Sequence, residues 1–314
     1  MSFSNEVRNE LSRIIPEKEC CVKAELLALM AVNGTAVETG AGDILLRTIA
    51  ENAATARKIY RLFKEAYQLQ AAVKVIKQRR FNKQHIYEVE MLLQPDKLWI
   101  MNELNLAFDQ GKPKAFNNRL LLKRNCCKRA FLRGIFLSRG SVNRPEVDYH
   151  LEIVVNDRRL AAEIQELLDK FALEARGVER KNNLVLYIKE SEKIADFLRV
   201  VGASKALLDY ENVRIIKSMR NEVNRQVNCE TANLGKTIDA SLRQLELIKG
   251  LADSDGLEIL PPHLRELALA RLTYPDYSLK ELGAAMNPPL SKSGVAYRMR
   301  KLERYIEEIP NYGK

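Results

Sequence analysis

Residues 20–36 read CCVKAELLALMAVNGTA, and residues 126–142 read CCKRAFLRGIFLSRGSV. At a constant offset of 106 residues, one pair of adjacent cysteines aligns with the other, and Gly34 aligns with Gly140 without a gap. Alanine and leucine positions between these markers also match. A repeat of this length indicates a duplicated structural unit, so the fold is expected to have internal symmetry.

Each copy of the stretch predicts a helix that opens a unit with the same order of elements. Helices are predicted from apolar positions three and four residues apart, and strands from alternation of apolar and polar residues. The first unit is expected to contain a helix over 20–33, strands over 34–39 and 43–50, a helix over 52–68, strands over 71–79 and 85–93, and a helix over 95–108. The second unit is expected to contain a helix over 126–139, strands over 140–144 and 148–155, a helix over 157–173, a hairpin over 176–189 and a helix over 191–200. Each unit therefore reads αββαββα, and two such units predict an α+β domain with antiparallel sheets and pseudo-two-fold symmetry.

The chain becomes all-helical after the second unit. Residues 204–227 predict a long polar helix, and four shorter helices are expected over 235–250, 262–273, 278–286 and 291–309, separated by prolines. We therefore expect a two-repeat domain over 1–203, a helical linker over 204–228 and a separate all-α domain over 229–314.

The charge of the chain favours a polyanionic partner. Its 314 residues carry a net charge of +10, and 46% of them are apolar, which is enough for a sizeable core. Residues 1–15 lack the basic segment and apolar run of a secretion signal, and no window approaches about 18 unbroken apolar residues. A cytoplasmic protein is the expectation, and DNA, RNA and an anionic membrane surface are the candidate polyanions, among which charge alone does not choose.

The cysteines do not indicate a disulfide-stabilised secreted domain, because four of the five stand in adjacent pairs. We expect reduced, partly buried thiols and no metal or other cofactor. Adjacent cysteines lack the two-residue spacer of usual zinc motifs. A zinc site would therefore require all four to converge through side-by-side packing of the two repeats.

The repeated helix resembles the LAGLIDADG motif of homing endonucleases, at residues 26–34 and 132–140. The αββαββα order agrees with that family. The resemblance implies that the two motif helices pack along the pseudo-two-fold axis, with small residues at the third motif position, here Ala28 and Gly134. It also implies that the sheets form a saddle on DNA, and that an acid at the eighth motif position of each helix binds Mg²⁺.

The eighth motif positions depart from that pattern, because they are Asn33 and Arg139. Magnesium is usually bound through one or two carboxylates, and two-metal cleavage needs both ions to be held. We therefore predict a scaffold without nuclease activity and assign no catalytic residue. An endonuclease or intron maturase with non-standard metal ligands is the enzymatic alternative.

Basic side chains cluster in two acid-free runs, over 74–83 and 110–145, and the second run holds ten of them. Most charge runs are solvated faces, but these lie in a domain that resembles a DNA-binding scaffold. Phosphate contacts would position the protein without reading sequence. The candidates for such contacts are Lys74, Lys77, Arg79, Lys123 and Arg124.

The end of the chain predicts a helix-turn-helix. Apolar residues in the first helix are Leu279, Leu282 and Met286, and those in the second are Val295, Met299, Leu302 and Ile306. Prolines separate the two helices, and Ser291 is placed to cap the second. In such motifs the second helix enters the major groove of DNA. The candidate DNA-binding residues are Ser291, Lys292, Ser293, Tyr297, Arg298, Arg300 and Lys301.

The combination of these parts is similar to the WhiA family of bacterial transcription regulators over essentially the whole chain. The segment NRQVNCETANLGK at 224–236 and the segment SKSGV at 291–295 carry the match beyond the repeats. The resemblance implies binding to double-stranded promoter DNA, mainly through the C-terminal domain, with roles in sporulation or cell division. The last helices are also similar to the promoter-reading domain of sigma factors, which makes an RNA polymerase sigma factor a further candidate partner.

With DNA as the partner, we expect a cytoplasmic, nucleoid-associated monomer that has no membrane partner and whose symmetry is internal. A general nucleoid-associated protein is the third hypothesis. It predicts equal affinity for promoter and random DNA, whereas a regulator predicts a preference.

Overall fold

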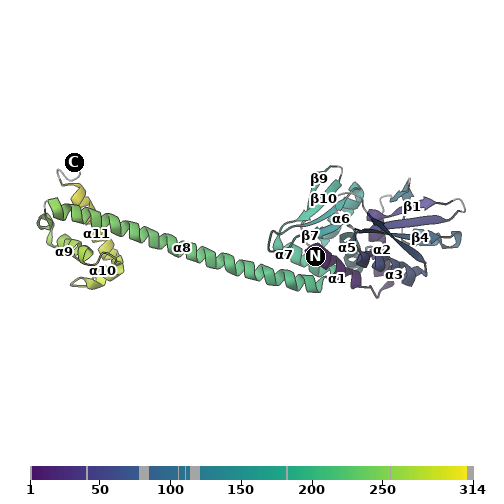
Figure 1. The fold of residues 1–314 in the computed structure, drawn as a ribbon, viewed down its shortest axis with the longest axis horizontal. Helices are drawn as coiled ribbons and strands as arrows, with labels where there is room; N and C mark the ends of the chain where they lie inside the picture. The colour runs from purple at the N-terminus through teal and green to yellow at the C-terminus, as the bar shows by residue number, and fades with distance from the viewer. Residues whose placement is uncertain are drawn as a thin grey trace. The chain divides into compact units, whose positions relative to one another are not determined.

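The computed structural model describes residues 2–39, 42–77, 85–104, 106–109, 111–113, 121–181, 183–254 and 256–309. The chain forms two compact units, Met1–Ser218 and Met219–Lys314 (Figure 1). Each unit has its own cluster of buried apolar side chains. Among the described residues, we find no helix with the length and apolar content needed to cross a membrane.

The two repeats of the first unit have the predicted antiparallel sheets. The elements of the first repeat are α2 (Glu19–Asn33), β1 (Thr35–Glu38), β2 (Ile44–Ala50), α3 (Ala53–Tyr67), β3 (Ala71–Lys77), β4 (His85–Leu93), η1 (Pro95–Lys97) and α4 (Trp99–Glu103). Those of the second are α5 (Asn125–Arg139), β7 (Gly140–Val142), β8 (Leu151–Val155), α6 (Arg158–Lys170), β9 (Arg176–Arg180), β10 (Asn183–Ile188) and α7 (Ser191–Val201). The strand orders, β1-β2-β4-β3 and β7-β8-β10-β9, are equivalent, which confirms the duplication.

Two elements of this unit lie outside the repeats. Helix α1 (Phe3–Arg13) begins at Ser2, whose hydroxyl accepts a hydrogen bond from the backbone N–H of Asn5. A short strand pair, β5 (Phe108–Asp109) and β6 (Lys112–Pro113), lies between the repeats in sequence and was not expected.

The helix predicted over 95–108 is much shorter than expected. The structure has one 3₁₀ turn followed by α4, and α4 ends at Glu103. Leu104 and Leu106 are both buried although they are two residues apart. The helix ends in a turn, because the backbone N–H of Leu104 donates to the carbonyl oxygen of Ile100 at 2.9 Å and that of Leu106 donates to the carbonyl oxygen of Met101 at 2.7 Å.

The motif helices α2 and α5 pack against each other in the centre of the first unit, as the resemblance implied (Figure 1). A Cβ added at Gly134 would lie 2.7 Å from the Cβ of Ala28 and 2.8 Å from the carbonyl oxygen of Glu25. The backbones can approach this closely only because position 134 has no side chain. The small residues at the third motif position therefore set the distance between the repeats.

A buried ionic network crosses this helix pair. The carboxylate of Glu25 is fully buried and pairs with the ammonium of Lys58 and, at 3.2 Å, with the guanidinium of Arg133. Lys58 also donates to the carbonyl oxygen of Leu11 at 2.9 Å. Burial lowers the pKa of Lys58 to about 8 and raises the pKa of Glu25. Sequence analysis did not predict this network, because its members come from three different helices.

The second unit is built from helices, as predicted. After the C-terminal part of α8 (Ser204–Ser254) come η2 (Leu257–Ile259), α9 (Pro262–Thr273), α10 (Leu279–Ala285) and α11 (Lys292–Glu307). The helices expected over 204–227 and 235–250 are one continuous helix, so the predicted break is wrong. Residues 228–234 contain neither Gly nor Pro. The single Gly235 costs about 1 kcal/mol relative to Ala, which a long helix tolerates.

Candidate nucleic-acid interface

Helices α10 and α11 begin at well-formed caps. The Ser278 hydroxyl accepts from the backbone N–H of Glu281, and the Glu281 carboxylate accepts from the backbone N–H of Ser278 at 2.8 Å. Ser291 caps α11, as predicted, by accepting from the backbone N–H of Gly294 at 3.1 Å. Both caps satisfy N–H groups that a helix leaves without internal partners, so the turn between the helices has defined ends.

One face of α11 packs into the apolar core of this unit. Its buried residues are the four predicted from spacing: Val295, Met299, Leu302 and Ile306. They belong to the same buried cluster as Leu282 and Met286 from α10 and its C-cap, and Leu264 and Leu267 from α9. Because this face is used for packing, the orientation of α11 is set and its opposite face is left to solvent.

Gly283 allows the close contact between α10 and the turn that follows it. The backbone N–H of Leu290 donates to the carbonyl oxygen of Gly283 at 2.8 Å. A Cβ at position 283 would lie 2.3 Å from the carbonyl oxygen of Leu290. Sequence analysis overlooked this residue, and the signal that was available is a glycine inside a helix of seven residues.

A buried arginine ties the helices of the unit together. Arg271 of α9 is 2% exposed and donates to the carbonyl oxygen of Tyr277 at 2.6 Å and to the side-chain oxygen of Gln244 at 3.1 Å. Gln244 in turn donates to the carboxylate of Glu303 on α11 at 3.1 Å. This network holds α8, α9 and α11 in place and was also missed, since an arginine reads as a surface residue in sequence.

The predicted DNA-binding side chains lie on the exposed side of α11. Tyr297 is 64% exposed, Arg298 is half-buried, and the remaining predicted residues are exposed: Ser291, Lys292, Ser293, Arg300 and Lys301. The hydroxyls of Ser291 and Ser293 lie 3.0 Å apart. The structure therefore brings the predicted set together on one helix, around its N-terminus and along its solvent face.

The cations of α11 have no carboxylate partner among the described residues. In the part of the chain that the structure describes, none of them forms an ion pair with a carboxylate: Lys292, Arg298, Arg300, Lys301 and Arg304. The guanidinium of Arg300 donates only to the carbonyl oxygen of Ala296, one turn earlier, at 3.3 Å. These charges are available to an external anion.

The side chains at the two eighth motif positions, Asn33 and Arg139, form a hydrogen bond with each other. Arg139 donates from Nε to the side-chain oxygen of Asn33 at 3.0 Å, and the Asn33 amide donates to the carbonyl oxygen of Ile49 at 3.2 Å. Where the resemblance places two acids, the chain has one neutral and one cationic side chain that satisfy each other. This pair offers a metal ion a single amide oxygen and no carboxylate.

The candidate phosphate contacts differ in their surroundings. Lys123 and Arg124 are exposed and directly precede α5, of which Arg124 is the N-cap residue. Lys74 pairs with the carboxylate of Glu90 at 2.6 Å, so its charge is already compensated. Arg79 and the side chain of Lys77 lie outside the described residues.

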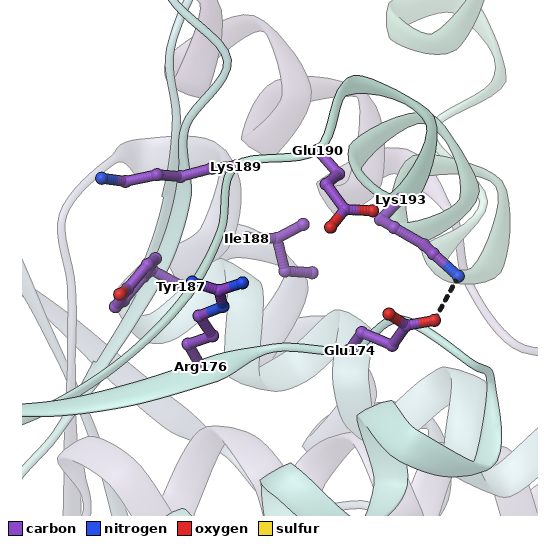
Figure 2. A pocket seen from close by; sticks show the side chains of 7 residues that line it. All are labelled: Glu174, Arg176, Tyr187, Ile188, Lys189, Glu190 and Lys193. Atoms are coloured by element: carbon purple, nitrogen blue, oxygen red, sulfur yellow. Dashed lines mark hydrogen bonds and ion pairs between the residues drawn. The ribbon is translucent and has the colours of Figure 1, made fainter.

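A surface hollow of about 170 Å³ lies beside β10 and α7 (Figure 2). Its lining mixes both signs of charge, and Lys193 pairs across it with Glu174 at 2.8 Å. The charges largely compensate each other, and the apolar part of the lining is limited to Ile188, the ring of Tyr187 and the alkyl parts of the charged side chains. The hollow therefore gives no reason to move the candidate site away from α11.

Comparison with known proteins covers nearly the whole chain. Family models match for the WhiA N-terminal LAGLIDADG-like domain at residues 19–106, the WhiA LAGLIDADG-like domain at 128–220 and the WhiA C-terminal HTH domain at 223–306. A "Probable cell division protein WhiA" of Syntrophomonas wolfei subsp. wolfei is 63% identical over 98% of this chain and 99% of its own length. One of the same name from Heliobacterium modesticaldum is 46% identical over 100% of this chain and 98% of its own.

A solved structure agrees with these matches. The crystal structure of full-length DUF199/WhiA from Thermatoga maritima is similar with a TM-score of 0.61 and 25% identity, and it covers 99% of this chain and 100% of its own. The fold predicted from the duplicated helix and the helix-turn-helix is thereby confirmed. The chain belongs to the WhiA family of LAGLIDADG-like, helix-turn-helix proteins.

Proposed function

We propose that this chain is a sequence-specific DNA-binding transcription regulator that reads promoters with α11. The observation that carries the proposal is the set of unpaired cations on a helix whose other face is buried and whose N-terminus is capped. Helices of this kind place their N-terminal residues against base edges in the major groove. The names of the relatives, probable cell division proteins, support target genes that act in cell division.

The roles proposed for the side chains follow from their chemistry. Lys292 and Arg300 are suited to guanine, whose major-groove edge presents two acceptors. Ser291, Ser293 and Tyr297 have hydroxyls for base or phosphate oxygens, and Arg298 and Lys301 flank them for phosphate contacts. Residues 229–314 are assigned to reading, 204–228 to linking and 1–203 to a scaffold, whose Lys123 and Arg124 add contacts that do not depend on sequence.

A binding comparison tests this function. Genome-wide mapping of bound sites first supplies the promoter sequences. The purified protein is then titrated at fixed salt onto a mapped promoter duplex and a shuffled duplex of equal length. Specific binding of this kind is expected to exceed non-specific binding by about 10³-fold or more. Equal affinities would instead support a general nucleoid-associated protein. A sigma factor as partner is tested separately by co-purification.

We further propose that the first unit does not cleave DNA, because its motif helices end in Asn33 and Arg139 rather than in two carboxylates. The test is incubation of purified protein with supercoiled plasmid and Mg²⁺ or Mn²⁺. No nicked product above the buffer control is expected. Nicking that disappears on chelation would establish the endonuclease or maturase alternative.

A further inference from the structure

The N-terminal ends of α2 and α5 bring together four thiols, here termed the four-cysteine cluster: Cys20, Cys21, Cys126 and Cys127. Their sulfur atoms all lie within 4.8 Å of one another. Two of the four residues are buried and two are half-buried, and none forms a disulfide. Side-by-side packing of the repeats has thus produced the convergence that a zinc site would require.

The distances within the cluster suit a single tetrahedral ion. Zinc–thiolate bonds of about 2.3 Å place the sulfurs of a tetrahedron about 3.8 Å apart. The sulfurs of Cys126 and Cys127 are 3.9 Å apart, so adjacent residues in the first turn of a helix reach this spacing without a two-residue spacer. The largest separation in the cluster has to shorten by only about 1 Å, which side-chain rotation supplies.

Disulfide formation within either pair is unfavourable. Adjacent residues have Cα atoms about 3.8 Å apart, whereas a disulfide needs about 4.4–6.8 Å. An iron–sulfur cluster is also a poorer fit, because several irons and inorganic sulfides spread the ligating thiolates over more space than one ion does. A disulfide between the two helices is the competing chemistry, and the experiment below separates it from metal binding.

The helix ends favour negative charge at this position, whereas burial raises the pKa values of the Cys21 and Cys127 thiols. Each cysteine pair lies in the first turn of its helix, where unpaired N–H groups give a partial positive charge that stabilises anions. The N-cap residues, Lys18 and Arg124, are exposed cations, and neither side chain makes a capping hydrogen bond. Two helix N-termini therefore meet at a group that carries a net charge of −2 when four thiolates hold one divalent ion.

We propose that the four-cysteine cluster binds one Zn²⁺ ion and thereby clamps the two repeats together. The thiols that are protonated release their protons to solvent on binding, and the four sulfurs each donate one electron pair to the ion. The site is closed by four protein ligands, which is the arrangement of structural rather than catalytic zinc. This reverses the expectation, drawn from residue spacing alone, that these thiols hold no metal.

Metal content and cobalt spectroscopy on the full-length protein test the proposal. The protein is purified under reducing conditions, and its metals are measured by mass spectrometry, with one zinc per chain as the expected result. After chelation and desalting under reductant, titration with Co²⁺ should produce thiolate-to-cobalt charge-transfer bands and the visible bands of a tetrahedral site, saturating at one equivalent. No uptake of Zn²⁺ or Co²⁺ by the reduced protein, or iron with sulfide in place of zinc, would overturn the proposal.

Cysteine variants locate the site. Cys20→Ser and Cys126→Ser alter the two half-buried ligands and should abolish the cobalt bands, whereas Cys229→Ser removes the exposed thiol of α8 and should leave them unchanged. Retention of one full equivalent by both cluster variants would show that the metal lies elsewhere.

Alkylation of the unmodified protein gives an answer even if a variant misfolds. With zinc bound, only Cys229 should react rapidly, and after chelation the half-buried Cys20 and Cys126 should react as well. A cross-helix disulfide in protein that takes up no metal after reduction would contradict the proposal.

Discussion

Helices α5 and α11 are both basic, yet their cations serve opposite purposes. On α5, Arg129 donates to the carbonyl oxygen of Val200, Arg133 pairs with buried Glu25, and Arg139 bonds to Asn33. On α11, no cation is paired with a carboxylate among the residues that the structure describes. The basic side chains of α5 hold the first unit together, and those of α11 are left for an external anion.

This difference shows that a count of positive charges does not tell which cations are free to bind an external anion. The acid-free run over 110–145 contains more basic residues than α11. Several of its side chains are nevertheless committed to carbonyl, amide or carboxylate oxygens of the protein itself. What distinguishes the two helices is whether each cation already has a partner, and substitutions at matched positions can measure that difference.

The largest effect is expected for Arg133→Met on α5. It removes one cation from a fully buried carboxylate, and breaking a buried pair in this way costs about 3–5 kcal/mol. The free energy of unfolding can be followed by denaturant titration with the fluorescence of Trp99, the single tryptophan, which lies in the first unit. Arg300→Met is the matched control, followed by circular dichroism because Trp99 lies in the other unit, and it should change the free energy of unfolding of its own unit by less than about 0.5 kcal/mol. A similar small change for both variants would remove the contrast between the helices.

Gly134→Ala should also destabilise the first unit, by about 1–3 kcal/mol, because the new methyl group meets Ala28 and the backbone at position 25. The same probe measures it. Gly235→Ala provides the control, since a Cβ there has nothing within 4 Å. As a helix-interior replacement of glycine, it should leave unfolding of the first unit unchanged and stabilise α8 by up to about 1 kcal/mol. Normal stability of Gly134→Ala would mean that the helices are not in close contact.

Arg300→Ala should reduce the preference for promoter over shuffled DNA by about 1–3 kcal/mol while leaving the fold intact. The measurement is the ratio of the two affinities at one salt concentration, with circular dichroism as the check on folding. Arg243→Ala, an exposed arginine on α8, is the control and should keep the preference. If the preference survives Arg300→Ala and falls in Arg243→Ala, α11 is not the reading helix.

The smallest effect is expected for the double substitution Lys123→Ala/Arg124→Ala. Loss of two phosphate contacts should make the slope of log affinity against log salt less steep by about 1.8, equally for promoter and shuffled DNA. A matched double variant is Arg158→Ala/Lys170→Ala, whose cations pair with Glu179 at 3.1 Å and Glu166 at 2.6 Å. It should change the slope less. An unchanged slope in the first variant would mean that this part of the chain does not touch DNA.

Much of the fold was predictable because the relevant signals are local. The period of apolar residues identified the four residues of α11 that are buried, and the serine before it identified the cap. The helix over 95–108 and the break before residue 235 were wrong for a related reason. At both places the local pattern is weak, and the outcome is decided by the backbone turn after Glu103 or by the absence of Gly and Pro over 228–234.

The sequence by itself determined the duplication, the order of the elements, the loss of the motif acids and the face on which α11 packs, because each can be read from residue types and their spacing along the chain. Only the tertiary structure decided which charges are paired and which thiols meet. Arg133 and Glu25 are 108 residues apart, and Arg139 and Asn33 are 106 apart. Such contacts exist only once α2 and α5 pack, since the shape of the packed helices, not the chain between them, sets those distances.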